Sequence, residues 1–304
     1  MRLTNIKKRF IRKLKFLRLK KKSIKLSGLY KKLLKSKLNI YDIGAGQRIL
    51  PEIINFDGVS RVHLIDPNKN LDYSFNQLKN YFLDHKNIFK FRTAISDKTK
   101  IQKYYESKIS TISTFAINFK KSKKYTNLYP LKPNKKMVYS FRDFLKSRKL
   151  QKPDMIKIDV EGLELKVLNS ILNCSNPFLL QIEVNINNPI FKESFNTINN
   201  ILNKKNYFLY TLFPSYGDYN FSTNQTVFNN NISLNDIETN FNKQSLLQAE
   251  CYYVKKKSKY SIKEFVLISG FGLSSLFLEK FNINKKILNS NQKKLLTKVY
   301  NIIK

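Results

Sequence analysis

Short apolar runs alternate with amphipathic segments through the middle of the chain. The runs predicted as strands are residues 39–43, 61–66, 88–95, 155–160, 178–184, 207–212 and 250–254. Helical spacing of apolar residues falls between them, over residues 71–84, 141–150 and 165–172. Strands that alternate with helices in this rhythm predict a doubly wound, mostly parallel α/β sheet, here of seven strands.

The two ends of the chain have a different pattern. Apolar residues spaced for one helix face predict a basic amphipathic helix, at Ile6, Phe10, Leu14 and Leu17. The pair Ser27-Gly28 is expected to end this zone. Residues 256–304 are predicted to form a basic helical extension. The expected organisation is therefore an extension over 1–37, a domain over 38–255 and a second extension over 256–304.

Charge is distributed unevenly along the chain. The 57 Lys and Arg against 21 Asp and Glu give a formal net charge of +36. Residues 1–40 hold 16 basic residues and no acid, 255–304 hold 12 and 2, and 118–152 hold 12 and 1. A/T-rich codons would explain abundant lysine, although not the missing acids. The alternative is an anionic partner, such as a membrane surface, a lipid-linked saccharide or a nucleic acid.

Composition excludes several protein classes. The only cysteines are Cys174 and Cys251, which cannot form a disulfide framework, and the only histidines are His63 and His85. No ligand set for a structural zinc is present, and we expect no metal. No apolar run reaches the roughly 18 residues of a membrane span, and no signal peptide is visible. We expect a cytoplasmic protein, with peripheral contact to a membrane as an option.

Three predicted strands end in residues that suit a cofactor. Asp42-Ile-Gly-Ala-Gly46 closes the first strand, Asp66 the second and Asp97 the third. Ligands of such folds bind beyond the carboxyl ends of the strands. Glycines there let the backbone approach a ligand, a carboxylate after the second strand can accept ribose hydroxyls, and Asp97 would lie near an adenine edge. Each signal alone also fits a plain turn. Together they indicate a nucleoside-containing cofactor.

A second motif follows the fourth strand. Lys-Ile-Asp-Val-Glu-Gly-Leu-Glu-Leu runs over residues 157–165. Asp159 and Glu161 are expected to face the same cleft, where they could bind the substrate, orient its hydroxyl or act as a base. The alternative makes one of them a helix N-cap and Glu164 a first-turn acid. Glu183, expected at the end of the fifth strand, is a weaker candidate.

These motifs, with Leu-Ile-Asp-Pro and Ser-Phe-Arg-Asp-Phe-Leu, make the chain resemble the FkbM family of S-adenosylmethionine-dependent methyltransferases over about residues 38–255. The resemblance implies a class I methyltransferase (Rossmann-like) sheet with helices on both faces. It also implies that S-adenosyl-L-methionine lies above the first two strands. The residues it implies for the methionine end are Asp42, Gly44, Ala45 and Gly46. It implies Asp66 for the ribose and Asp97 for the adenine.

The resemblance further implies O-methylation of a hydroxyl, on a sugar of a polysaccharide, glycolipid or related metabolite. Arg48 departs from the family, which usually has a further glycine there, so its side chain either crowds the cofactor or swings away. Asp66 replaces the commoner glutamate. Residues 108–133 are expected to help form the acceptor pocket.

Three other functions compete with this interpretation. An RNA methyltransferase would use the basic zones for phosphates, but the chain lacks an RNP-like aromatic signature. A non-catalytic binding protein on the same scaffold is motivated by Arg48. A nicotinamide oxidoreductase is least favoured, because Ile49 stands where Gly-x-Gly-x-x-Gly needs its last glycine. The sequence does not identify the methyl acceptor.

Overall fold

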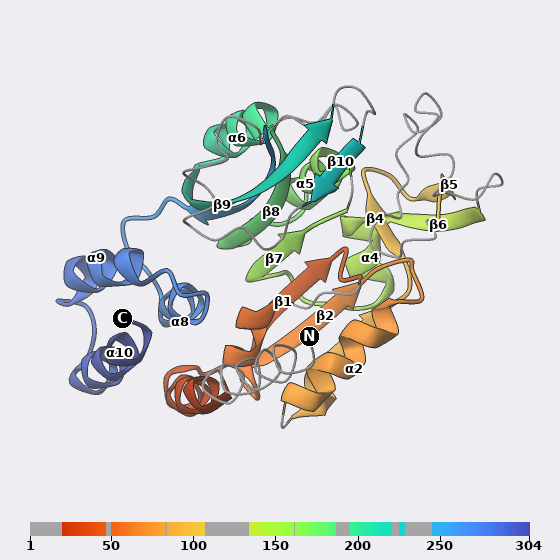
Figure 1. Cartoon of the computed structure of the whole chain (residues 1–304). Coiled ribbons are helices and arrows are strands. Elements are labelled where there is room, and N and C mark those ends of the chain that lie inside the picture. Colours follow the sequence, from red (N-terminus) through yellow and green to blue (C-terminus); the bar gives the residue numbers. More distant parts are fainter. Residues whose placement is uncertain are drawn as a thin grey trace, which may run out of the picture.

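A computed structural model describes residues 20–46, 50–82, 84–106, 134–160, 162–186, 195–220, 225–228 and 245–304 (Figure 1). The strands are β1 (Leu38–Ile43), β2 (Ser60–Ile65), β3 (Ile88–Phe91), β4 (Ala94–Ser96), β5 (Lys100–Tyr104), β6 (Asn134–Ser140), β7 (Met155–Ile158), β8 (Leu179–Asn185), β9 (Tyr207–Asn220), β10 (Gln225–Phe228) and β11 (Ser245–Lys255). The α-helices are one over residues 20–33, α2 (Leu71–Tyr81), α4 (Phe141–Ser147), α5 (Glu164–Leu172), α6 (Phe195–Lys204), α8 (Ile262–Gly270), α9 (Ser274–Asn284) and α10 (Ser290–Ile303). Two 3-10 helices are η1 (Pro51–Phe56) and η2 (His85–Asn87).

The main sheet has the strand order β10-β9-β11-β8-β7-β1-β2-β3. Strands β8, β7, β1, β2 and β3 pair in parallel, whereas β11, β9 and β10 pair antiparallel. The predicted α/β sheet is therefore confirmed. It has eight strands among the described residues rather than seven, because β10 extends the edge beyond β9.

The predicted third strand, over residues 88–95, is wrong as a single strand. It divides into β3, which joins the main sheet, and β4, which pairs with β6 in a separate sheet of order β4-β6-β5. The backbone N–H of Thr93 donates to Phe91 O at 2.9 Å and closes the turn between the halves. Both halves contribute buried residues, so the apolar run by itself does not reveal the break.

Buried side chains form one cluster on each face of the main sheet. The helix over residues 20–33 with η1, α2, α8, α9 and α10 covers one face, and α4, α5 and α6 cover the other. Alternate residues of β1 separate them, since Ile40 joins the first cluster and Tyr41 the second. Helices thus cover both faces, as predicted. No helix in the described part of the chain has the length and apolar character to cross a membrane.

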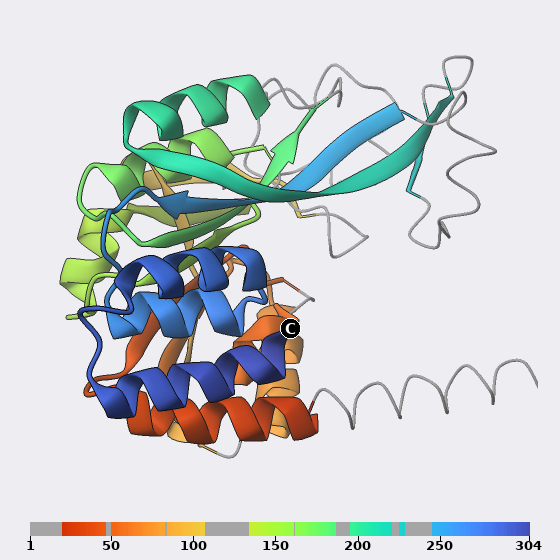
Figure 2. The same ribbon diagram turned by 90° about the vertical axis from the view of Figure 1, so that its left-hand side faces the viewer.

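The terminal segments share this core with the sheet. Phe265 of α8 and Leu296 of α10 belong to the same cluster as Ile40 of β1. Figures 1 and 2 show α8, α9, α10 and the helix over residues 20–33 together on one side of the sheet. The segment beyond residue 255 is helical, and packing continues across the expected boundaries at 37 and 255.

The N-terminal helix passes through the point where it was expected to end. Ser27 and Gly28 lie inside the helix over residues 20–33, and the Ser27 hydroxyl donates to Ile24 O at 3.1 Å. Tyr30 is buried, and its hydroxyl oxygen lies 2.9 Å from Ser269 Oγ in α8. Tertiary packing therefore outweighs the low helix propensity of glycine. The predicted stripe at Ile6, Phe10, Leu14 and Leu17 lies outside the described residues.

Gly270 allows α8 to lie directly against η1. A Cβ atom on this residue would stand 2.1 Å from the Phe56 ring, which is far inside van der Waals contact. The Asn55 side chain donates to Gly270 O at 2.7 Å and accepts from Ser23 Oγ at 2.8 Å. Three segments distant in the sequence are thereby joined.

We expect Gly270→Ala to lower the free energy of unfolding by about 1–3 kcal/mol, because the new methyl group must displace Phe56. Gly28→Ala is the matched control, since nothing lies within 4 Å of its Cβ position and the residue is helical. It should stabilise by roughly 0.5–1 kcal/mol. Urea unfolding of both variants measures the difference, and equal stabilities would contradict the close packing.

His63 is a core residue. It stacks on Tyr41 at 4.3 Å and on Phe89 at 5.2 Å between ring centroids. Both ring nitrogens are buried without a hydrogen-bond partner in the described structure. Burial, helped by the charge of Arg61, lowers the pKa of His63 from 6.5 to about 4. The imidazole is therefore neutral in the folded protein at physiological pH.

This neutral histidine should make the fold sensitive to acid. His63 takes up a proton near pH 6.5 in the unfolded chain but only near pH 4 in the folded protein. The contribution of its neutral ring to the free energy of unfolding is therefore present above pH 6.5 and is lost as the pH falls toward 4. We expect wild type to lose about 2 kcal/mol relative to His63→Phe between pH 7 and pH 5. Urea unfolding at both pH values measures the difference in the free energy of unfolding between wild type and His63→Phe, in which the effects of the other titrating groups cancel. If this difference did not change with pH, His63 would not be held neutral by the fold.

Candidate active site

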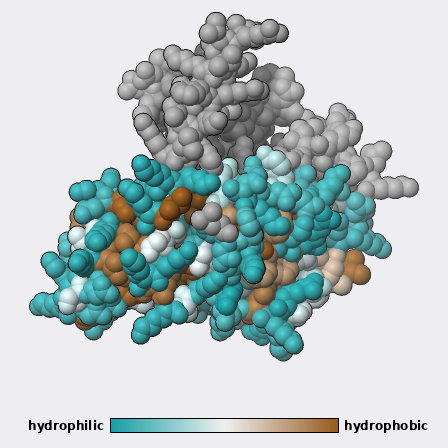
Figure 3. Space-filling view, turned by 90° about the horizontal axis from the view of Figure 1, so that it is seen from below, coloured by the Kyte–Doolittle hydropathy of each residue, from teal (hydrophilic) through white to brown (hydrophobic). Residues whose placement is uncertain are grey.

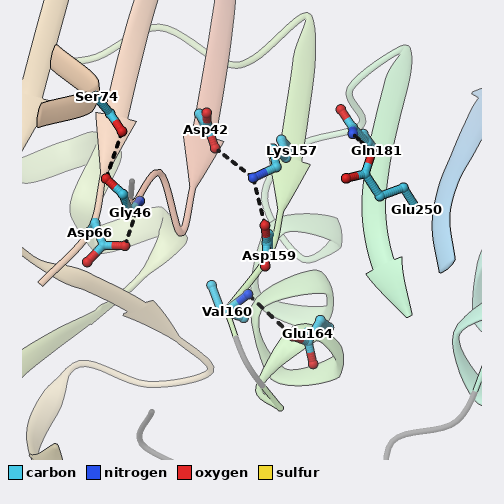
Figure 4. Close-up of polar contacts among 10 residues, drawn as sticks. All are labelled: Asp42, Gly46, Asp66, Ser74, Lys157, Asp159, Val160, Glu164, Gln181 and Glu250. Carbon is cyan, nitrogen blue, oxygen red and sulfur yellow. Dashed lines mark hydrogen bonds and ion pairs between the residues drawn. The ribbon is translucent and has the colours of Figure 1, made fainter. Parts of the chain in front are cut away.

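Three buried polar side chains form a row across the centre of the sheet. Asp42 of β1 lies opposite Lys157 of β7, which lies opposite Gln181 of β8. All three are almost fully buried. Since side chains alternate along strands, they point to the face that Ile40 and Met155 also occupy. Figure 4 shows this row near the carboxyl ends of the parallel strands.

Lys157 lies between two carboxylates. Its Nζ atom is 2.8 Å from Asp159 Oδ2 and 3.6 Å from Asp42 Oδ1 (Figure 4). Burial by itself would lower the pKa of Lys157, but the charges of Asp159 and Asp42 outweigh it and raise that pKa. Burial raises the pKa of Asp42, and the charge of Lys157 opposes this rise. Removing one member of such a group leaves a buried charge uncompensated, at a cost of about 3–5 kcal/mol.

The glycine loop after β1 lies directly against the segment after β7. Gly44 has a φ of +87°, and a Cβ atom on it would stand 1.6 Å from the carbonyl oxygen of Asp159. The Asp159 N–H donates to Ile43 O at 3.0 Å, and the Gly44 N–H donates to Ile65 O at 2.8 Å. A residue with a side chain is excluded at Gly44. Ala45 is buried beneath the loop.

Asp66 fastens the same loop from the end of β2. Its Oδ2 accepts from the Gly46 N–H at 3.0 Å, and its Oδ1 accepts from the Asn68 N–H at 2.7 Å. Ser74 of α2 donates to Gly46 O at 2.7 Å. Burial raises the pKa of Asp66 to about 6, although both N–H groups favour the ionised form. Each carboxylate oxygen keeps a second lone pair, which can accept a hydroxyl of a bound molecule.

The structure brings together Asp42, Asp66 and Asp159, three of the candidate residues. The charges of Asp42 and Asp159 raise the pKa of Asp66. Asp97 does not end the strand beside β2, because the chain leaves the main sheet after β3. It is an exposed residue after β4, and it accepts from Ser96 Oγ at 3.0 Å. Glu161, Arg48 and the segment 108–133 lie outside the described residues.

Glu164 has the structural role that the alternative interpretation gave it. It is buried in the first turn of α5 and accepts from the Gly162 N–H at 3.0 Å and the Val160 N–H at 3.3 Å. The N-cap of α5 is Leu163, so Asp159 does not cap this helix. The carboxylate of Asp159 instead faces Lys157, and its side chain is 28% exposed.

Sequence reasoning missed the extension of the polar row toward β11. The Gln181 side chain donates to Glu250 Oε2 at 2.9 Å (Figure 4). Glu183 lies inside β8 rather than at its end, and it pairs in register with Glu250. A signal was present, because Gln181 and Glu183 interrupt an apolar run at alternate positions. Among the described residues, no group of three or more His, Cys, Asp and Glu side chains is arranged to hold a metal.

A parallel sheet with a glycine loop after β1 and an acid after β2 is typical of α/β folds that bind a nucleoside-containing cofactor at their strand ends. The family model of the methyltransferase FkbM domain matches residues 42–209. The chain therefore belongs to the FkbM methyltransferase family. It is a methyltransferase, and its cofactor is S-adenosyl-L-methionine.

Three solved structures illustrate the likeness. A methyltransferase FkbM from Methylobacillus flagellatus KT is 16% identical with a TM-score of 0.40, covering 72% of this chain and 43% of its own. The precorrin-6y C5,15-methyltransferase of Geobacter metallireducens GS-15 is 11% identical (TM-score 0.37; 76% and 87% covered). TrmK of M. capricolum, in complex with S-adenosyl-homocysteine, is 12% identical (TM-score 0.37; 92% and 98% covered). This chain spans less than half the length of the methyltransferase FkbM from Methylobacillus flagellatus KT. Comparison with curated proteins gives no match.

The carboxylate of Asp66 should control cofactor affinity. We expect Asp66→Asn to weaken S-adenosylhomocysteine binding tenfold or more, because charged hydrogen bonds contribute about 1.5–3 kcal/mol each. Wild-type affinity should fall as pH drops below about 6, where Asp66 takes up a proton. Calorimetric titration at pH 5 and pH 7.5 measures both effects. Asp97→Asn tests the predicted adenine contact separately. Unchanged affinity in Asp66→Asn would contradict the assignment.

Proposed function

We propose that the protein transfers the methyl group of S-adenosylmethionine to a hydroxyl on a sugar of a polysaccharide, glycolipid or related metabolite. The observation that carries the proposal is the partly exposed carboxylate of Asp159. It lies beside the glycine loop, where β1 and β7 end, and the ammonium of Lys157 holds one of its oxygens.

The residues at the strand ends fit the cofactor. Asp66 offers carboxylate lone pairs to the ribose hydroxyls, and Gly46 leaves the backbone open beside it. Asp42 is buried beneath the loop with the ammonium of Lys157 3.6 Å from its Oδ1, and its carboxylate oxygens have no hydrogen bond in the described structure. Gly44 and Ala45 complete the loop at the methionine end. The adenine contact of Asp97 stays a prediction.

The reaction needs alignment and a destination for one proton. The bound cofactor supplies a methyl group on a positively charged sulfur, so the new C–O bond forms as the C–S bond breaks. Alignment of the acceptor oxygen supplies much of the acceleration. Lys157 donates to Asp159 Oδ2 at 2.8 Å, and Oδ1 accepts no hydrogen bond from the described part of the chain. In this proposal Oδ1 accepts the hydroxyl proton, and Glu161 is the second candidate for that role.

The charge of the site favours a sugar over RNA. Asp42, Asp66 and Asp159 gather at the strand ends, and Glu183 and Glu250 lie close enough for their charges to act on Lys157 and Asp42, respectively. Among these interacting charges of the described residues, Lys157 is the single cation. Phosphates next to the reacting hydroxyl would be repelled by such a surplus of carboxylates. Sugar hydroxyls, in contrast, donate hydrogen bonds to them.

Asp159→Asn should lower the rate of methyl transfer about 10²–10⁴-fold, because the amide oxygen is a much weaker proton acceptor. S-adenosylhomocysteine affinity should change little. Glu279→Gln, at an exposed carboxylate of α9, is the matched control and should keep activity within about threefold, since a general base must lie within hydrogen-bond reach of the proton it accepts. Transfer of labelled methyl groups to a panel of saccharides, glycolipids and RNA measures rate and acceptor. An active Asp159→Asn variant, or product only on RNA, would contradict the proposal.

A further inference from the structure

A surface rich in lysine joins the two ends of the chain. We define the lysine face as the outer side of the helix over residues 20–33, of α10 and of the turn between α9 and α10. We propose that the lysine face docks on an anionic lipid membrane. This inference goes beyond the methyl transfer reaction and does not depend on the identity of the acceptor.

The fold makes one surface from two distant segments. Figures 1 and 2 show the helix over residues 20–33 beside α10. Leu26 and Tyr30 of the first helix belong to the same buried cluster as Leu296 and Val299 of α10. Each helix therefore turns its apolar side inward and presents its lysines outward. The described helices of two basic zones, far apart in the sequence, therefore form one face.

The lysines of this face have no ion-pair partner within the described part of the chain. Its exposed lysines are Lys21, Lys22, Lys25, Lys31, Lys32, Lys285, Lys286, Lys294, Lys298 and Lys304. Residues 20–33 and 280–304 contain no acid. None of these lysines forms an ion pair within the described structure. Like charges four residues apart, as at Lys294 and Lys298, destabilise a helix, so an anionic partner would relieve a real cost.

Exposed aliphatic side chains favour a membrane over a nucleic acid. Ile24 is 51% exposed, Ile283 is 59% exposed and Ile287 is 55% exposed, each next to or within two residues of a lysine. Figure 3 shows the molecule from below, with apolar side chains between hydrophilic ones. Interfacial surfaces combine lysine with aliphatic residues that enter the headgroup region. Single-stranded nucleic acids are instead bound through stacked aromatic and arginine side chains, and all basic residues of the lysine face are lysines.

Docking through this face would leave the active site open. The helices cover one face of the sheet, whereas Asp66 and Asp159 lie at the carboxyl ends of its strands. An acceptor attached to the same membrane could then reach the strand ends from the side.

Co-sedimentation of the full chain with lipid vesicles tests the proposal. We expect binding to vesicles of equal amounts of phosphatidylcholine and phosphatidylglycerol, and none to pure phosphatidylcholine. The combined variant Lys25→Glu, Lys32→Glu and Lys298→Glu should lower the partition coefficient at least about tenfold. The control variant Lys103→Glu, Lys135→Glu and Lys146→Glu has the same net charge and should retain binding within about threefold. Its three lysines lie on β5, β6 and α4, away from the lysine face.

A second variant separates lipid insertion from charge. Ile283→Ser with Ile287→Ser should weaken vesicle binding several-fold at unchanged charge. Each variant should bind S-adenosylhomocysteine as tightly as wild type, which verifies that it is folded. The same measurement distinguishes a failure of the membrane proposal from a failure of the methyltransferase proposal. Equal losses in both lysine variants would overturn the proposal. So would tighter binding to an RNA oligonucleotide than to the anionic vesicles at the same salt concentration, lost in the lysine-face variant.

Discussion

The contact of Lys157 with Asp42 and Asp159 is the constraint on which the centre of the molecule depends. A buried ammonium between two carboxylates is stable only if both remain at hydrogen-bonding or ion-pair distance. β1 and β7 must therefore keep their register, and the segment after β7 must turn back toward the loop after β1. Gly44 makes that return possible, because a Cβ atom there would collide with Asp159. The ion pair and the glycine thus fix the same geometry from two sides.

The two faces of the sheet protect this charged centre in different ways. On one face, α4, α5 and α6 form a continuous apolar cluster with Tyr41 and its neighbours. On the other, the terminal helices close over η1, where Gly270 and Phe56 are in direct contact. The helix over residues 20–33 and the helices α8 to α10 are therefore structural parts of the methyltransferase core as well as carriers of charge.

Positive and negative charge are segregated in space. Carboxylates gather at the strand ends around Lys157, whereas lysines without an ion pair in the described structure cover the outer side of the helix over residues 20–33 and of α10. The net charge of +36 is therefore a poor guide to the charge at the strand ends. The segregation is compatible with a neutral, hydroxyl-bearing acceptor at the site and an anionic partner elsewhere.

The α/β class, most strands and the residues at their ends are predictable from the sequence, because burial and turn formation leave local patterns of apolar residues, glycine and acids. The sequence also predicted the meeting of Asp42, Asp66 and Asp159, since parallel strands bring their carboxyl ends to one edge. Three features became visible only in the folded chain: residues 88–96 divide between two sheets, Gln181 and Glu250 extend the polar row, and the helix over residues 20–33 joins α10 in one face. These features depend on contacts between residues far apart in the chain, and no local pattern encodes which distant segment a strand or helix will meet.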